Sequence, residues 1–168
     1  MSSLKAKAFI GLGSNIGDRA GHLKTATKEL EKRLEDATCQ RSPIYLSKAW
    51  GVTNQNDFYN QVIAFETGLE PESLLHHCIQ VEKAMGRNRA RRWHSRNIDI
   101  DLLFVGNNIR QSEKLNLPHP MIEKRNFVLV PLMELAPQFI HPILGKTIEE
   151  LYLQTNDLLE VLMLEMHG

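Results

Sequence analysis

The sequence predicts a single α+β domain in which helices pack on a mostly antiparallel sheet. Apolar runs with strand character and helical stripes follow one another in the order strand, helix, strand, strand, helix, strand. This order is typical of a split βαβ, or ferredoxin-like, core. The 168 residues are enough to bury a core without disulfides or metals, and no repeat or linker divides them.

The first half of the chain predicts a strand, a helix and two further strands. The apolar run at residues 8–13 is expected to be a buried strand, and Asp18 can cap the helix after it. The apolar stripe of that helix has helical spacing and consists of Leu23, Ala26, Leu30 and Leu34. Residues 39–46 and 58–67 have the composition of strands, and a loop rich in Asn, Gln and Gly separates them.

The second half predicts a helix, a strand with two acids, and a helical end. Pro71 begins the helix and Gly86 ends it. After the acid-bearing strand, a turn signal at residues 106–108 suggests a small hairpin with residues 109–117. Further on we expect a short helix or apolar segment over residues 127–135, and a helical tail over residues 147–168 that starts in a capping box.

Asp99 and Asp101 stand two residues apart inside an otherwise apolar run. Alternation in a strand sends both acids to one face and the neighbouring Ile100 to the other. Two acids side by side repel each other and lose hydration, so a fold rarely keeps them there without a cation. Carboxylate oxygens suit Mg²⁺, and two such groups could bridge a pair of ions about 3.5–4 Å apart. A pair of solvated surface acids is the alternative.

The segment just before these acids, residues 86–96, holds five arginines and no acid. Arginines suit phosphate oxygens, so acids and arginines together indicate phosphoryl transfer from a nucleotide. A solvated basic surface is one alternative. RNA binding with the help of Trp93 is another, but it leaves the paired acids unexplained. His119, held between two prolines, could bond a phosphate oxygen or serve only as a turn residue.

Composition narrows the class of protein further. Lys plus Arg equals Asp plus Glu at 20 each, which argues against general binding to nucleic acid or membranes. Cys39 and Cys78 match no metal-ligand spacing and are expected to be reduced thiols. The sequence shows no signal peptide and no apolar span of membrane length, so we expect a cytoplasmic protein. The glycines of residues 11–17 mimic a dinucleotide fingerprint, but the third comes one residue late.

Six segments, in order and nearly in register over residues 6–145, resemble the 6-hydroxymethyl-7,8-dihydropterin pyrophosphokinase family. They are Gly11-Leu12-Gly13-Ser14-Asn15, Asp57-Phe58-Tyr59-Asn60, Gly86-Arg87-x-Arg89, Arg92-Trp93-x-x-Arg96-x-Ile98-Asp99-Ile100-Asp101-Leu102-Leu103, Pro118-His119-Pro120 and Phe127-Val128-Leu129-x-Pro131-Leu132. The resemblance implies a folate-pathway transferase with a ferredoxin-like core, in which the whole chain, 1–168, is one pyrophosphokinase domain. The implied reaction moves pyrophosphate from ATP to the hydroxymethyl group of the pterin, with in-line attack on the β-phosphorus and release of AMP.

The resemblance also implies roles for individual residues. Asp99 and Asp101 would ligate two Mg²⁺ ions, and Arg87, Arg89 and Arg96 would act in catalysis, the first two from a mobile loop. The implied ATP-binding residues are Arg96, His119, Glu82, Leu75 and Leu102. The implied pterin-binding residues are Ser47, Trp50, Phe58, Asn60, Trp93 and Phe127. We further expect a monomer whose partners are the small molecules ATP and a dihydropterin, with neither nucleic acid nor a membrane.

Overall fold

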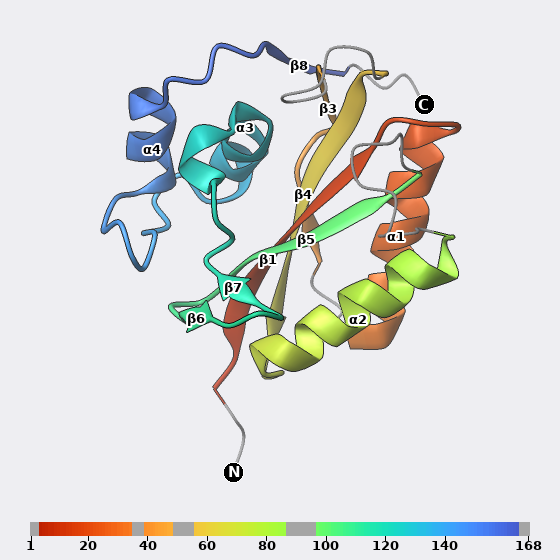
Figure 1. Ribbon diagram of the computed structural model, residues 1–168, viewed down its shortest axis with the longest axis horizontal. Coiled ribbons are helices and arrows are strands. Elements are labelled where there is room, and N and C mark those ends of the chain that lie inside the picture. Colours follow the sequence, from red (N-terminus) through yellow and green to blue (C-terminus); the bar gives the residue numbers. More distant parts are fainter. Residues whose placement is uncertain (1–3, 35–38, 49–55, 87–96, 165–168) are drawn as a thin grey trace.

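A computed structural model describes residues 4–34, 39–48, 56–86 and 97–164 (Figure 1). In chain order the elements are β1 (Ala6–Ser14), α1 (Arg19–Leu34), β2 (Gln40–Arg41), β3 (Tyr45–Ser47), β4 (Phe58–Thr67), α2 (Pro71–Ala84), β5 (Asp99–Val105), β6 (Arg110–Gln111), β7 (Asn116–Leu117), the 3-10 helix η1 (Ile122–Lys124), α3 (Asn126–Leu135), α4 (Ile148–Gln154) and β8 (Val161–Met163).

The main sheet has the order β5-β1-β4-β3-β8, and every neighbouring pair is antiparallel. Strand β1 lies inside the sheet, and its apolar residues are buried on both faces, as in a strand covered by helices on both sides. It pairs with β5 on one side and with β4 on the other. This architecture confirms the predicted α+β class with an antiparallel sheet and packed helices.

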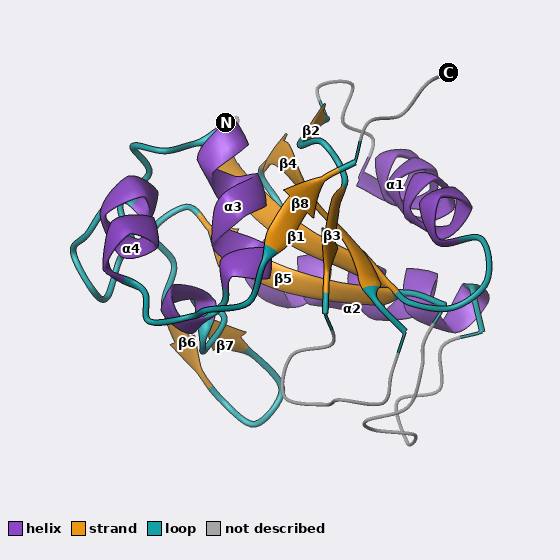
Figure 2. Ribbon diagram, turned by 90° about the horizontal axis from the view of Figure 1, so that it is seen from above, coloured by secondary structure: helices purple, strands orange, loops and turns teal. Residues whose placement is uncertain are grey.

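The sheet separates two hydrophobic cores (Figure 2). On one face α1 and α2 cover the sheet, and the predicted stripe of Leu23, Ala26 and Leu30 is fully buried there. On the other face α3 and α4 pack against Phe9, Val62 and neighbouring residues. Each fully buried aliphatic or aromatic side chain stabilises the fold by about 1.5–3 kcal/mol, so these two layers hold the sheet.

A β-bulge in β5 adjusts which side chains enter the second core. The register of β1 against β5 shifts between Phe9 and Ile10, which pair with Phe104 and Leu102. Leu103 is therefore the extra residue, and both Leu103 and Phe104 belong to the core under α3. Before the bulge, the strand alternates regularly and leaves its acids on that same face.

Two polar contacts fix α3 over the sheet. The Tyr45 hydroxyl donates a hydrogen bond to the carboxylate of Glu134, and burial together with this acid raises the pKa of Tyr45 to about 12. At the other end, an Asp157 carboxylate oxygen accepts a hydrogen bond of 2.8 Å from the main-chain N–H of Asn126, the first residue of α3. A carboxylate at a helix N-terminus is favourable for the helix dipole.

Three expectations about elements need correction. Residues 39–46 form two short strands, β2 and β3, because Pro43 lacks an N–H and Ser42 makes the contacts with Val62 between them. Residues 109–117 do not form a hairpin with β5. They pair among themselves as β6 and β7, with Leu115 and Leu117 buried in the core under α2.

The helical tail predicted over residues 147–168 is correct only for its first part. Thr147 and Glu150 form the predicted capping box, but α4 ends at Gln154. The chain then becomes extended, and β8 pairs with β3. Strand β3 otherwise offers an unpaired edge, and satisfying it outweighs the helical pattern of the sequence. In the described ranges, none of the helices combines the length and apolar character that crossing a bilayer requires.

A pH-dependent stability follows from His141, which is buried in the segment that joins α3 to α4, with its ring centroid 5.5 Å from that of Phe104. Its Nδ1 accepts hydrogen bonds from the main-chain N–H groups of Ile143 (3.2 Å) and Leu144 (3.1 Å), and burial lowers the pKa of the imidazole. The neutral ring therefore stabilises the fold fully above the unfolded pKa of about 6.5, and this stabilisation is lost as pH falls through the folded pKa.

We expect the urea midpoint of the wild type to fall between pH 7.5 and pH 5.5, and to fall less in His141→Asn, which keeps an acceptor and removes the titrating group. Other histidines with lowered pKa values contribute equally to both proteins, so the difference between the two slopes isolates His141. Equal slopes of the urea midpoint against pH in the two proteins would contradict this role of His141.

Candidate active site

The two acids of β5 lie on the sheet face that carries α3. Asp99 and Asp101 are partly exposed, whereas Ile100 between them is buried in the core under α1 and α2. Across the sheet, Asp99 pairs with Gly13 and Asp101 pairs with Gly11. Both acids therefore stand beside residues of β1 that have no side chain, and we call these two glycine positions the bare strip. Side chains of other residues border it: a Cβ placed on Gly11 would lie 3.5 Å from Leu103, and Gly13 itself is buried.

Asn60 lies on the far side of this bare strip. It pairs with Gly13 from β4, so Asp99, Gly13 and Asn60 form one row across three strands. With strands about 4.8 Å apart, the row spans about 10 Å between the α-carbons of Asp99 and Asn60. The residue between the acid and the amide in this row is Gly13, which has no side chain of its own.

The Asn60 side chain is buried and held in one orientation. Its Nδ2 donates a hydrogen bond of 2.6 Å to the hydroxyl of Ser47 on β3, which is buried as well. A Cβ placed on Gly13 would lie 3.6 Å from Asn60 Oδ1 and 3.6 Å from Cδ1 of Phe58. The amide carbonyl and the edge of an aromatic ring therefore face the space above Gly13.

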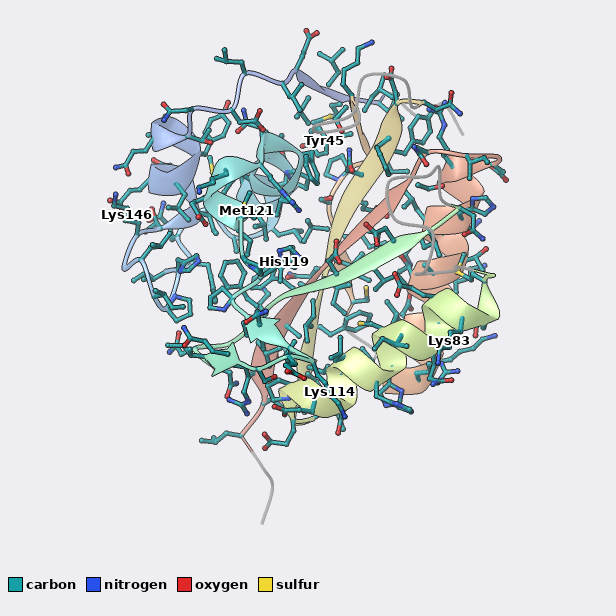
Figure 3. All side chains as sticks on the ribbon, viewed as in Figure 1. Tyr45, Lys83, Lys114, His119, Met121 and Lys146 are labelled. Atoms are coloured by element: carbon teal, nitrogen blue, oxygen red, sulfur yellow. The ribbon has the colours of Figure 1, made fainter. Side chains whose placement is uncertain are left out.

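The outer edge of β5 is fixed by two groups. A carboxylate oxygen of Glu82, whose exposed fraction is 1%, accepts a hydrogen bond of 2.9 Å from the main-chain N–H of Ile100. Further along, the main-chain N–H of His119 donates to the carbonyl of Leu103 at 3.0 Å. This second bond brings the segment after β7, and His119 with it, alongside the acid-bearing strand (Figure 3).

His119 and Arg125 lie close enough to the acids to interact with them electrostatically. The Nδ1 of His119 donates a 2.7 Å hydrogen bond to the carbonyl of Pro120, so in the neutral ring Nε2 carries the lone pair. Burial lowers the pKa of His119; Arg125 acts in the same direction, whereas the bond to Pro120 and the charge of Asp99 raise it. Burial likewise lowers the pKa of Arg125, against the attraction of Asp101 and Asp99.

Arg125 is a site residue that the sequence analysis missed. It stands just before α3, with its guanidinium 5.7 Å from the ring centroid of Phe127. The sequence contained a signal for Arg125. It lies two residues before Phe127 and six after His119, both of which belong to the segments that resemble the family.

The predicted site residues fall into three groups. The residues on or beside the α3 face of the sheet are Asp99, Asp101, Ser47, Phe58, Asn60, His119 and Phe127. Leu75, Glu82 and Leu102 lie on the other face, where α2 meets β5. Trp50, Arg87, Arg89, Trp93 and Arg96 lie outside the described residues.

The donor set around β5 fits a hard divalent cation. Two carboxylates on one face offer oxygen ligands, and Mg²⁺ in nucleotide sites is commonly held by one or two carboxylates while substrate phosphates and water complete its shell. Within the part of the chain that the structure describes, no group of three or more His, Cys, Asp or Glu is placed to hold a metal by itself. The acids therefore suit a metal that arrives with an anionic ligand.

Comparison with known proteins gives a consistent result. Residues 9–137 match the model of the family 7,8-dihydro-6-hydroxymethylpterin-pyrophosphokinase (HPPK). A 2-amino-4-hydroxy-6-hydroxymethyldihydropteridine pyrophosphokinase of Aquifex aeolicus is 42% identical over 145 residues, which cover 86% of this chain and 89% of that protein. The protein of the same name from Methylorubrum extorquens is 43% identical over 144 residues, covering 86% and 90%.

Solved structures agree on the fold. The HPPK-DHPS protein of Plasmodium falciparum superposes with a TM-score of 0.68 at 16% identity, covering 91% of this chain and 46% of that one. This chain therefore spans less than half the length of that solved protein. At this identity the match concerns the fold alone.

The charges around His119 predict how its imidazole titrates. We expect the pKa of His119 to rise in Arg125→Gln, which removes a repelling cation, and to fall in Asp99→Asn, which removes an attracting anion. An NMR titration of the histidine ring protons measures both shifts. Lys124→Gln removes a neighbouring exposed cation and should leave His119 unchanged. Shifts in the same direction in the Arg125 and Asp99 variants would contradict this arrangement.

Proposed function

This chain belongs to the 7,8-dihydro-6-hydroxymethylpterin-pyrophosphokinase family, and we propose that it transfers pyrophosphate from ATP to 6-hydroxymethyl-7,8-dihydropterin with release of AMP. Membership makes it an ATP-dependent pyrophosphokinase of folate biosynthesis. The observation that carries the finer proposal is the row of Asp99, Gly13 and Asn60, which supports a phosphate site and a flat-ring site side by side.

Asp99 and Asp101 are proposed to hold two Mg²⁺ ions together with the ATP phosphates. Bound there, the ions would neutralise charge on the phosphate oxygens and lower the barrier to in-line attack on the β-phosphorus. The pairing with Gly11 and Gly13 supports this role because neither strand neighbour on β1 places a side chain of its own between the carboxylates and a phosphate. Acids of this kind are costly unless a cation joins them.

His119 and Arg125 are proposed to bind the phosphates beside the acids. Arg125 is partly buried, and a guanidinium with little water around it binds phosphate strongly. Because the Nδ1 of His119 donates to the carbonyl of Pro120, its Nε2 is available to a phosphate. A phosphate oxygen would favour protonation of Nε2 and would accept a hydrogen bond from it. Arg87, Arg89 and Arg96 are proposed to stabilise the charge that develops between the β-phosphorus and the departing AMP.

The dihydropterin is proposed to lie beside Gly13, against Asn60 and Phe58. Asn60 would accept a hydrogen bond from the ring through Oδ1, because Ser47 holds its Nδ2. Phe58 and Phe127 would flank the flat ring, with Trp50 and Trp93 as further contacts. In this placement the hydroxymethyl group points toward Asp99, where the phosphates lie.

The base of ATP is proposed to extend over the outer edge of β5 toward α2, where Leu75, Glu82 and Leu102 lie. The buried carboxylate of Glu82 would act mainly by holding Ile100 and thereby the strand that carries the acids. Glu82 would thus support nucleotide binding through its hydrogen bond to Ile100.

The organisation of the whole chain is proposed on the same grounds. The antiparallel order β5-β1-β4-β3, with α1 and α2 on one face, supports a ferredoxin-like split βαβ core. We propose one domain over residues 1–168 and a monomer, whereas the arginine loop expected from the sequence lies outside the described residues. A cytoplasmic location is proposed as well.

The product of the reaction tests the proposal. With ATP, Mg²⁺ and the hydroxymethyl dihydropterin, we expect AMP and the pyrophosphorylated pterin, resolved by liquid chromatography. The variant Asp99→Asn/Asp101→Asn should lose turnover by about a thousandfold or more and keep its thermal midpoint, because these side chains are outside both cores. Glu31→Gln on α1 is the control. ADP as the sole nucleotide product would contradict the proposed transfer of pyrophosphate.

Gly13 offers a second test of the bare strip. A methyl group at Gly13 meets Asn60 and Phe58 at ordinary contact distances, so Gly13→Ala should fold, yet it would occupy the space proposed for the pterin. We expect KM for the dihydropterin to rise about tenfold or more. Gly11→Ala places the same methyl group against Leu103, 3.5 Å away, and should raise this KM far less. Equal effects of the two substitutions would count against the pterin placement.

A further inference from the structure

Arg19, the first residue of α1, reaches across to the start of β4. Its Nη1 donates a hydrogen bond of 2.9 Å to the main-chain carbonyl of Asp57. Its guanidinium carbon lies 4.0 Å from the ring centroid of Tyr59, in a cation–π contact. One side chain therefore holds the residues on both sides of Phe58.

Phe58 itself points away from Arg19. Its backbone pairs with Ser47, and its ring lies over Gly13 on the face that carries the acids. Arg19 holds both neighbours of Phe58, the carbonyl of Asp57 and the ring of Tyr59. Because successive side chains of a strand point to alternate faces, holding these neighbours also fixes the direction of the Phe58 side chain. Arg19 thus controls the position of a side chain that it does not touch.

Other contacts strengthen the same junction without replacing Arg19. Asn15 donates from Nδ2 to the carbonyl of Asn56 at 3.3 Å. Lys48 lies 3.7 Å from the carboxylate of Asp57, but the pair is exposed and so contributes little. Arginine suits the Arg19 position because its planar group can stack on a ring and donate a hydrogen bond in its own plane at once, which lysine cannot do.

We propose that Arg19 is a positioning residue for Phe58 and thereby sets the affinity for the dihydropterin while leaving the affinity for ATP nearly unchanged. This inference rests on the proposed function. A residue that served only the stability of α1 would lower the thermal midpoint and would not distinguish between the two substrates.

The test measures kcat and KM for both substrates, with the thermal midpoint of each variant. We expect Arg19→Gln to raise KM for the dihydropterin about tenfold and KM for ATP by less than about twofold. Arg19→Lys, which keeps the charge and loses the combined geometry, should fall between wild type and Arg19→Gln. Tyr59→Leu should raise the same KM, and the double variant should add little to Arg19→Gln because both act through one contact.

Arg41→Gln is the matched control, since Arg41 on β2 pairs with Glu31 at 3.2 Å and should change neither KM. Equal changes in both KM values, an unchanged KM for the dihydropterin in Arg19→Gln, or full additivity with Tyr59→Leu would overturn the proposal. Wild-type AMP release is recorded in the same assay. If the wild type releases no AMP, the proposed function and this inference are both overturned. If it releases AMP but the Arg19 variants change both KM values equally, the inference alone is overturned.

Discussion

The antiparallel pairing of β1 with β5 and β4 is the constraint on which the site depends. It sets Gly11 and Gly13 between the acids of β5 and the amide of Asn60, and no local feature of these strands could do so alone. A slip of one residue in either pairing would turn the acids or Asn60 to the core under α1 and α2. The helices on both faces hold this register through their buried apolar area, and they therefore also determine which side chains face the candidate site.

The site itself contributes little to stability. Adjacent acids repel, and two glycines give up the contacts that larger side chains would make. The surrounding structure compensates through Glu82 and the His119 segment on the edge of β5, and through the contacts of Tyr45 and Asp157 that seat α3. The candidate site is thus a bare strip of sheet bordered by well-held groups.

The sequence predicted most elements because their signals were local. Strand β4 and helix α2 followed from apolar spacing and Pro71, and the face of the acids followed from alternation. Missed features depended on distant partners: β8 forms because β3 offers an edge, and Arg125 reaches the acids only once α3 is seated. The row through Gly13 could not be predicted either, because register between strands far apart in sequence is decided by the packed cores.

The distance between metal and pterin tests the central claim most directly, since the row allows only about 10 Å between the two proposed sites. Mn²⁺ in place of Mg²⁺, with an unreactive ATP analogue, would report it through paramagnetic relaxation of the pterin hydroxymethyl protons. We expect strong line broadening in the wild type and none in Asp99→Asn/Asp101→Asn. Unbroadened lines in the wild type, or equal broadening in both proteins, would contradict the account.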